Sequence, residues 1–349
     1  MEILVKNIIL KSKEDIEVAF LYKLGPIYEQ LKERNVKVKT FNDSNNVIII
    51  ARNIIKYCRS QKIDIINVHD GGLKSLLIYY IILKTTKIKM IRTVHADEIE
   101  NINRFIKNKI KKKLVYIFMK ATMVLSEKVI CVSKAVEIPL KNEFNLKNTV
   151  VIYNGIDKKN LVNKRVSKFN NRIIFCGRLF PQKGVDILIE SLNILKQKKK
   201  IEFELVIVGD GVERKKLEHM TNEYQLSDKI KFKGFQDNVL KFLDDSSVFI
   251  YPIIWNEAFG ISIVEAMGRG CIPITFEKGG IPEIISNGEN GFLVKKISAE
   301  LLAETILKVY DLSDNEKNNI INNAIATASK FTLDNTVDKL RDEYNKISN

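Results

Sequence analysis

The chain has 349 residues, of which 45% are hydrophobic, so it is long enough to form two hydrophobic cores. No apolar run reaches the ~18 residues of a membrane-spanning helix, and the longest, Leu76 to Leu83, is typical of a buried element. The net charge of +15 favours an anionic partner, and nucleic acid, an anionic lipid surface and a diphosphate ligand are all compatible with it.

Cysteine usage and the first residues bear on the compartment. The four cysteines are widely scattered and include no C-x-x-C pair, which argues against a zinc site and a disulfide framework. The opening stretch MEILVKNIILK carries Glu2 and Lys6 in its apolar run, so we expect no secretory signal there. We therefore expect a cytoplasmic protein, with peripheral contact to the inner face of the cell membrane as an option that the charge allows.

The first half of the chain alternates between strand and helix patterns. Longer stretches of helical spacing predict helices at 14–33, 47–60 and 73–84. Short apolar runs predict strands at 3–10, 36–41, 63–68, 88–94 and 128–132. This alternation predicts a parallel, doubly wound sheet whose ligands bind beyond the carboxyl ends of the strands.

Two predicted strands end at histidines. His69, followed by Asp70, comes directly after strand 63–68, and His95 comes directly after strand 88–94. A lone histidine is more often structural than functional, but a strand-end position in this architecture makes the two interpretations about equally probable.

Residues 101–126 contain seven basic residues, no acid, and apolar residues at helical spacing. This pattern predicts a basic amphipathic helix centred on 104–120. Two interpretations remain open for it. The apolar stripe is either buried against the sheet, leaving a solvated basic face, or it lies on an anionic membrane surface.

The second half begins after a polar stretch at 158–171, which we take as the domain boundary. Its first strand, 172–177, runs through Gly177 and Arg178 into a glycine-bounded loop with Lys183, and a helix follows at 185–196. An arginine that binds two oxygens at once and a nearby lysine suit a diphosphate. The next strands are expected at 203–211, where Gly209 stands at the strand end, and at 230–235.

The stretch 250–270 is the most informative part of the chain. An apolar strand ending runs through a polar turn with Glu257 into Gly260 and a helix at 261–267 that contains Glu265. The first turn of such a helix offers unpaired N–H groups to an anion. Carboxylates accept hydrogen bonds from sugar hydroxyls. Considered alone, the two acids are better explained as ordinary helix-surface residues.

The surrounding pattern decides between these interpretations. The sequence E-A-F-G-x4-E-A-M-x-x-G resembles the signature of the retaining family 4 glycosyltransferases of the GT-B fold. The segments G-R-L-x3-K-G, VVIYNGID and GGIPEIISNGENGFLV resemble further segments of that family in the expected order. The resemblance implies two facing Rossmann-like domains with a cleft between them. These are an acceptor domain at 1–160 and a nucleotide-sugar domain at 172–330, and a C-terminal helix in 331–349 crosses back to the first domain.

The resemblance also implies roles for individual residues. Arg178 and Lys183 would neutralise the departing diphosphate in place of a metal, so no cofactor and no metal are expected. Glu265 would bind ribose, Glu257 the sugar, and His95 the sugar and its phosphate. The implied catalytic residues are His95, Arg178, Lys183 and Glu257. The implied donor-binding residues are Gly177, Arg178, Lys183, Gly209, Glu257, Ala258, Phe259, Gly260, Ile261 and Glu265. The acceptor-side candidates are His69 and Asp70.

The expected reaction is hexosyl transfer, with retention of configuration, from a UDP- or GDP-linked donor to a glycan or lipid-linked acceptor in cell-surface polysaccharide or glycolipid synthesis. One departure concerns the first loop, where the family has paired glycines and this chain has Glu14 and Asp15, which would repel a phosphate. Two alternatives stay open. A nucleotide-sugar 2-epimerase shares the fold, and a nucleic-acid-binding protein explains the charge but gives the four residues Arg178, Lys183, Glu257 and Glu265 no role.

Overall fold

The computed structural model describes residues 2–12, 15–21, 26–41, 44–69, 71–162, 169–198 and 201–348, and it divides into two units. The first unit comprises Met1–Asn154 with Leu333–Asn349, and the second comprises Gly155–Thr332. The chain passes into the second unit a few residues before the polar stretch that we expected to be the boundary. The backbone N–H of Ile156 donates to Phe331 O at 3.0 Å, which ties this entry to the second unit.

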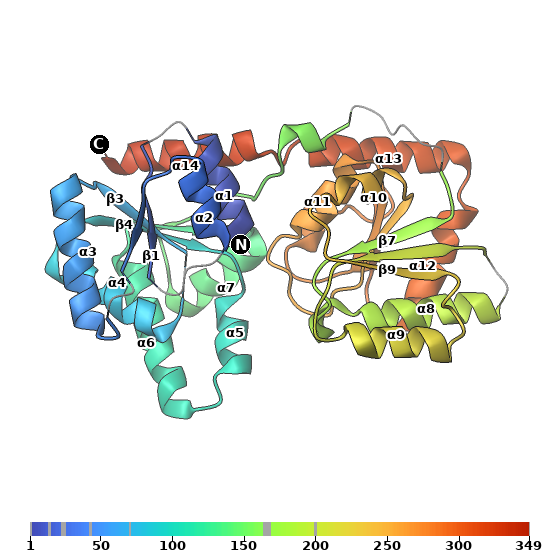
Figure 1. The fold of residues 1–349 in the computed structure, drawn as a ribbon, viewed down its shortest axis with the longest axis horizontal. Coiled ribbons are helices and arrows are strands. Elements are labelled where there is room, and N and C mark those ends of the chain that lie inside the picture. The colour runs from blue at the N-terminus through green and yellow to red at the C-terminus, as the bar shows by residue number, and fades with distance from the viewer. Residues whose placement is uncertain are drawn as a thin grey trace. The chain divides into compact units, whose positions relative to one another are not determined.

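The first unit contains a parallel four-stranded sheet of order β3-β4-β5-β6 and a separate parallel pair, β1-β2. Its strands are β1 Val18–Phe20, β2 Val38–Thr40, β3 Ile65–Val68, β4 Lys89–Val94, β5 Lys128–Cys131 and β6 Thr149–Val151. Its helices are α1 Glu2–Lys11, α2 Pro26–Glu33, α3 Val47–Gln61, α4 Leu73–Thr85, α5 Glu98–Phe105, α6 Lys109–Leu125, α7 Lys134–Phe144 and α14 Leu333–Ser348. Figure 1 shows α1 and α14 lying side by side.

Helix α14 is held to the first unit although it follows the whole second unit in sequence. Leu340 packs in a buried cluster with Ile91, Ile130 and Ile152 of the strand region. Asn67 of β3 donates a hydrogen bond to the hydroxyl of Tyr344 at 2.8 Å. The first unit is therefore completed by the last segment of the chain.

The sequence prediction was wrong for the first residues. The run 3–10, predicted as a strand, is helix α1, and the predicted helix 14–33 is replaced by strand β1 and helix α2 in its described residues. A short apolar run does not distinguish a buried strand from a helix by periodicity. Here Ile8 packs against the buried cluster that includes Leu340 of α14, and this contact stabilises the helix. Pro26 begins α2, as expected for a residue that lacks a donor and disfavours helix before it.

The prediction of one continuous helix across 101–126 was also wrong. The chain forms α5 and then α6, with an extended residue, Ile106, between them. The side chain of Asn108 accepts a hydrogen bond from the N–H of Lys111 at 2.9 Å and so caps the second helix. A good N-cap inside a helical pattern restarts the helix and breaks the predicted continuity.

The second unit is a parallel six-stranded sheet of order β12-β11-β10-β7-β8-β9. Its strands are β7 Arg172–Cys176, β8 Glu204–Val208, β9 Ile230–Gly234, β10 Val248–Tyr251, β11 Ile272–Phe276 and β12 Phe292–Val294. Its helical segments are η1 Lys158–Asn160, η2 Pro181–Lys183, α8 Val185–Gln197, α9 Arg214–Glu223, α10 Leu240–Asp244, α11 Ile261–Gly268, η3 Ile281–Glu283, α12 Ala299–Asp311 and α13 Asp314–Ala328. Figure 1 shows α8, α9 and α12 on one face of this sheet and α10, α11 and α13 on the other.

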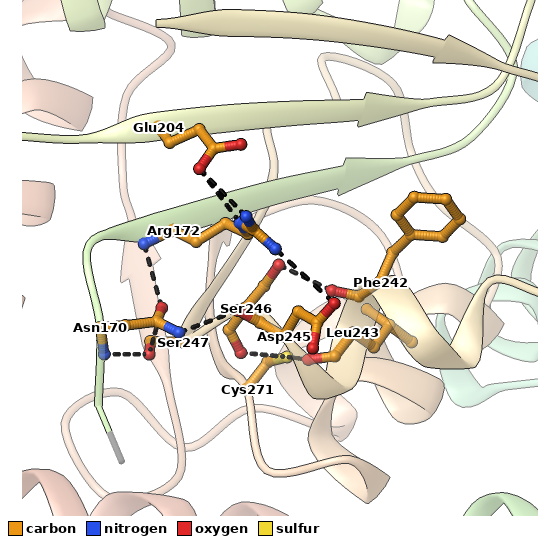
Figure 2. Close-up of polar contacts among 9 residues, drawn as sticks. All are labelled: Asn170, Arg172, Glu204, Phe242, Leu243, Asp245, Ser246, Ser247 and Cys271. Carbon is orange, nitrogen blue, oxygen red and sulfur yellow. Dashed lines mark hydrogen bonds and ion pairs between the residues drawn. The ribbon is translucent and has the colours of Figure 1, made fainter. Parts of the chain in front are cut away.

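A polar network fixes the amino ends of the central strands of this sheet (Figure 2). The N–H of Asn170 donates to Ser247 Oγ at 2.6 Å, and that hydroxyl donates back to Asn170 Oδ1 at 2.9 Å. Arg172 pairs with Glu204 at 3.1 Å and with Asp245 at 3.6 Å. All these groups are satisfied by one another, so we assign this end of the sheet a structural role.

Among the described residues of the first unit, Arg92 is the most deeply buried charged side chain. Arg92 of β4 is 1% exposed and donates to Glu98 Oε2 of α5 at 2.8 Å and to Thr122 Oγ1 of α6 at 2.7 Å. A buried guanidinium is tolerated only when it is paired and hydrogen-bonded. Arg92 therefore fastens both helices to the sheet.

Replacing Arg92 should lower the free energy of unfolding, because its partner Glu98 would lose its counter-charge. Arg92→Met should destabilise the first unit by about 3–5 kcal/mol, because Glu98 would stay partly buried without a counter-charge. A loss of this size should lower the first unit's melting temperature in calorimetry by roughly 10 °C. The double change Arg92→Met with Glu98→Leu should recover part of that loss. Equal destabilisation by the single and the double change would contradict the pairing.

Candidate active site

The second unit has its topological switch between β7 and β10. These strands pair in parallel through Ile173 and Ile174, and from there the chain adds β8 and β9 on one side and β11 and β12 on the other. Open α/β sheets bind ligands beyond the carboxyl ends of the strands at such a point. Arg178 lies two residues after the end of β7, and Glu257 lies in the turn that follows β10. The structure therefore places these predicted residues beside the switch.

Glycines let the loops beyond these strands approach one another. Gly209 has φ +137°, and a Cβ there would lie 1.9 Å from the carbonyl oxygen of Gly177. Gly184 has φ +63°, and its Cβ would lie 2.1 Å from the carbonyl oxygen of Pro252. Side chains at either position would clash with backbone, so the close contact of these strand ends requires glycine.

Lys183, Tyr251 and Glu257 form one hydrogen-bonded cluster. Lys183 Nζ lies 3.1 Å from Glu257 Oε2, and it also donates to the Tyr251 hydroxyl. The Tyr251 hydroxyl donates in turn to Glu257 Oε2 at 2.9 Å. The ammonium group also lies 4.7 Å from the centre of the Tyr251 ring, a cation–π distance. The arrangement presents a positive charge and a carboxylate at one point of the site.

Sequence reasoning missed Tyr251. The only signal was its position as the last residue of a buried strand before the polar turn, and the same position suits a core residue. Burial, and then the Glu257 carboxylate, raise the pKa of the Tyr251 phenol well above its usual value. The phenol therefore stays protonated and acts as a hydrogen-bond donor.

Arg178 differs from Lys183 in being exposed. Its guanidinium lies 5.1 Å from the ring centre of Phe180. Within the described residues it makes no hydrogen bond or ion pair, so its five donors remain available. The charge of Arg178 reaches Tyr251, whose pKa it lowers slightly against the larger upward causes. An anion beside Lys183 would therefore lie within the field of Arg178.

The turn from Glu257 into α11 is built by backbone contacts. The N–H of Gly280 donates to Glu257 O at 2.7 Å, and a Cβ at Gly279 would lie 2.2 Å from that oxygen. Gly260, with φ +97°, is the N-cap residue of α11, and Ile261 is the first residue of that helix. The first-turn N–H groups of a helix lack intrahelical partners and favour an anion.

The remaining predicted residues of this turn divide between backbone and side-chain roles. The ring of Phe259 is buried and meets the edge of Phe331 at 5.4 Å, so the ring is not open to a ligand. Ala258 is half-buried and small. Glu265 lies in the second turn of α11, where burial raises the pKa of its carboxyl to about 7. Its charge therefore changes near neutral pH.

In the first unit the structure brings His69 and His95 together at the ends of the paired strands β3 and β4. His69 Nδ1 lies 2.9 Å from His95 Nε2, and the rings stack at 5.2 Å between centres. Burial lowers the pKa of His69 to about 4, and burial together with His69 lowers that of His95 to about 3. Both rings are therefore neutral at neutral pH.

One ring nitrogen of this pair is able to form a hydrogen bond with a ligand. Nδ1 of His95 is buried and has no hydrogen-bond partner among the described residues. A buried polar atom without a partner costs free energy, so a ligand oxygen there would stabilise the site. Asp70 and Glu14 lie outside the described residues. Asp15 pairs with Lys37 at 3.6 Å.

The fold and the site define a class of protein, a glycosyltransferase with two Rossmann-like α/β domains of the GT-B type. The family model for Glycosyl transferases group 1 matches residues 157–327 of this chain, and the family model for Glycosyltransferase Family 4 matches residues 14–160. The site residues Arg178, Lys183, Glu257 and Glu265 lie in the first match, and the histidine pair lies in the second.

Individual proteins that are similar to this chain support this class. An uncharacterized glycosyltransferase of Methanocaldococcus jannaschii, MJ1178, is 32% identical over 99% of this chain and 93% of its own length. The amylovoran biosynthesis glycosyltransferase AmsK of Erwinia amylovora is 31% identical over 40% of this chain and 35% of its own length. The crystal structure of Anabaena HepE in complex with UDP superposes with a TM-score of 0.83 at 20% identity, covering 99% of this chain and 96% of that one. This chain belongs to the group 1 glycosyltransferases.

Removing the Tyr251 hydroxyl while keeping the aromatic ring should show what the hydroxyl alone contributes. Tyr251→Phe should lower turnover by about tenfold to a hundredfold, because a hydrogen bond to a charged group contributes roughly 1.5–3 kcal/mol. Steady-state kinetics at saturating donor measure this loss. Tyr57→Phe is the matched control, since it removes a 2.6 Å hydrogen bond to Glu17 in the first unit and should leave turnover unchanged. Equal losses in both variants would contradict a role for Tyr251 in the site.

Proposed function

We propose that the protein transfers a hexosyl group from a UDP- or GDP-linked sugar to a glycan or lipid-linked acceptor, with retention of configuration and without a metal. The observation that carries this proposal is the pair of cations, Arg178 and Lys183, beside a carboxylate at the β7–β10 switch. A nucleotide sugar needs both features, because its diphosphate is anionic and its sugar hydroxyls are hydrogen-bond donors.

Lys183 is proposed to exchange partners when the donor binds. Without ligand, its ammonium group pairs with Glu257 at 3.1 Å. A diphosphate carries more negative charge than one carboxylate, so it would attract Lys183 and leave Glu257 to accept from sugar hydroxyls. Arg178 would bind a second phosphate oxygen. Together the two cations stabilise the charge that develops on the leaving diphosphate, which is the work that a metal performs in other enzymes.

The surroundings of Glu257 support the proposal of retention without a covalent intermediate. When Lys183 turns to the diphosphate, Glu257 Oε2 would still accept from the Tyr251 hydroxyl and would also accept from a sugar hydroxyl. A carboxylate held by two donors is a weak nucleophile and a good positioning group. We therefore propose front-face substitution, in which the acceptor oxygen attacks on the side that the diphosphate leaves. Proton NMR of the product should show the anomeric configuration of the donor.

The nucleoside is proposed to bind along the ends of β8 and β9. At Gly209 a Cβ would lie 1.9 Å from the Gly177 carbonyl oxygen, and the Gly209 N–H donates to Gly234 O at 2.8 Å, so the ends of β7, β8 and β9 lie close together. Phe235, next after β9, is 73% exposed and offers an aromatic face to a base. His95, being neutral, would contribute a hydrogen bond and not a charge to the sugar or its phosphate.

The setting is proposed to be the assembly of cell-surface polysaccharide or glycolipid. The support for it is the name of the relative AmsK, an amylovoran biosynthesis enzyme. Calorimetric titration of UDP, GDP, ADP and their glucose conjugates into the full chain tests the proposed donor class. One diphosphate family should bind, and Lys183→Gln should abolish that binding. Binding of none of them would overturn the proposal.

Glu265 should make donor binding depend on pH. The ionised form accepts hydrogen bonds from ribose more strongly, so affinity should rise as the carboxyl, with its pKa of about 7, loses its proton. Affinity for the nucleotide sugar should be about tenfold lower at pH 6 than at pH 8. The histidines do not contribute, because they are neutral throughout that range.

Two glutamine variants provide the control. Glu265→Gln should weaken donor binding at pH 8 by about ten- to a hundredfold and remove the pH dependence. Glu257→Gln should keep the pH dependence and the nucleoside diphosphate affinity but lower turnover. A pH dependence that survives in Glu265→Gln would show that another group titrates.

Metal independence is expected from the two cations. Transfer should continue at its full rate in excess EDTA, because Arg178 and Lys183 carry the positive charge that the leaving group requires. Activity is followed by release of nucleoside diphosphate. Loss of activity in EDTA, with recovery on adding Mg²⁺ or Mn²⁺, would show that the assignment of the diphosphate to these residues is wrong.

A further inference from the structure

Helices α5 and α6 form a hairpin at the edge of the first unit. They lie side by side and meet at a turn that extends away from the four-stranded sheet (Figure 1). Arg92 binds Glu98 at the start of α5 and Thr122 in the last turns of α6. The base of the hairpin is therefore fixed to the sheet, and its tip at 105–110 is the part most open to solvent.

Helix α6 is apolar on two opposite faces. The inner face is buried and consists of Val115, Met119 and Met123, and Phe118 beside it meets the edge of Tyr80 of α4 at 5.3 Å. The outer face carries apolar residues at spacings of four, three and seven, which one helix face presents in a line. Their exposed fractions are 74% for Ile110, 40% for Leu114, 47% for Ile117 and 53% for Val124.

This outer stripe is not needed for the fold. The inner face already packs α6 against α4, and within the described part of the chain no other element buries the stripe. The sequence left open whether the apolar residues of this segment are all buried. The structure shows that Ile110, Leu114 and Ile117 are exposed. At about 1.5 Å per residue, the stripe from Ile110 to Val124 is roughly 20 Å long.

Basic residues border the stripe. Between 101 and 126 there are seven of them and no acid. Those near the tip and along the outer half of α6 are Lys107, Lys109, Lys111, Lys113 and Lys120, all exposed, with Lys112 half-buried. An apolar line flanked by ammonium groups matches a bilayer surface, where apolar side chains enter the acyl region and lysines extend to the phosphates.

We propose that the α5–α6 hairpin docks on an anionic lipid bilayer, with the outer stripe of α6 lying in the plane of the headgroups. An anionic bilayer is the partner that matches both the apolar stripe and the lysines beside it. Nucleic acid would use the lysines but leave the stripe exposed, and a second copy of the chain would bury the stripe but bring two sets of lysines together. Among the described residues no helix is long and apolar enough to cross a membrane, so the contact is interfacial.

Co-sedimentation of the full chain with vesicles tests the proposal. Vesicles of phosphatidylcholine with about a third phosphatidylglycerol should bind the protein at low salt, and pure phosphatidylcholine vesicles should not. Raising the ionic strength should weaken binding, because the attraction between lysines and lipid phosphates is screened. Failure of the wild-type chain to sediment with the anionic vesicles at low salt would overturn the proposal.

Two sets of variants separate charge from apolar insertion. Changing Lys107, Lys111, Lys112 and Lys113 to Glu should weaken vesicle binding by at least about six-hundredfold, since each of the four lost basic residues contributes about a factor of five. The triple change Ile110→Ser, Leu114→Ser and Ile117→Ser should weaken it by about a hundredfold at the same net charge. Calorimetric binding of UDP or GDP, whichever the wild type binds, and circular dichroism should stay at the wild-type level in both.

Matched controls lie elsewhere in the same unit. The charge control changes Lys32, Lys56, Lys84 and Lys87 to Glu, which alters the net charge by the same amount on other surfaces. The apolar control is Ile48→Ser, which removes a side chain of α3 that is as exposed as the stripe. Both controls should bind vesicles far better than the corresponding hairpin variants. Equal loss in the two charge variants would show that only net charge matters and would overturn the docking surface.

Two further outcomes would assign the surface to another occupant. A concentration-dependent dimer in sedimentation, present in the wild type and absent in the serine variant, would place a second copy on the stripe. RNA or DNA binding that the glutamate variant loses and the serine variant keeps, without vesicle binding, would identify a nucleic-acid surface. Either result contradicts the proposal, whereas loss of vesicle binding in both hairpin variants alone supports it.

Discussion

The ion pair between Lys183 and Glu257 is the contact on which the proposed site depends. It joins a loop after β7 to a turn after β10, and the Tyr251 hydroxyl bonds to both partners. Each charge is about one-fifth exposed, so neither is tolerated there without a partner. The pair also requires the close backbone contact between Gly184 and Pro252, because a side chain at that glycine would separate the two loops.

The two units contribute different chemistry. The second unit supplies charge through Arg178, Lys183 and Glu257, together with a Glu265 carboxyl that titrates near neutrality. The first unit supplies His69 and His95, which burial keeps neutral. A departing diphosphate is stabilised by fixed positive charge, whereas a sugar hydroxyl needs only a hydrogen-bond partner. The distribution of charge therefore suits a donor whose diphosphate lies on the second unit.

The sequence predicted the second unit well and the start of the first unit poorly, for physical reasons. Strands β7, β8 and β10 are apolar runs that are buried except for the first residues of β7 and β8, so their pattern has one interpretation. The run 3–10 is also mostly apolar but is a helix, because Ile8 packs against the buried cluster that contains Leu340, more than 300 residues later. No local pattern reports such a contact. Likewise, Tyr251 looked like a core residue, and its bonds to Lys183 and Glu257 were visible only in three dimensions.

A structure determined with the bound nucleoside diphosphate tests the central claim most directly. Our account predicts that the phosphates lie within hydrogen-bond distance of Lys183 Nζ and the Arg178 guanidinium, that Lys183 has left Glu257, and that the ribose contacts Glu265. A diphosphate bound away from the ends of β7 and β10, with the Lys183–Glu257 pair intact, would contradict it.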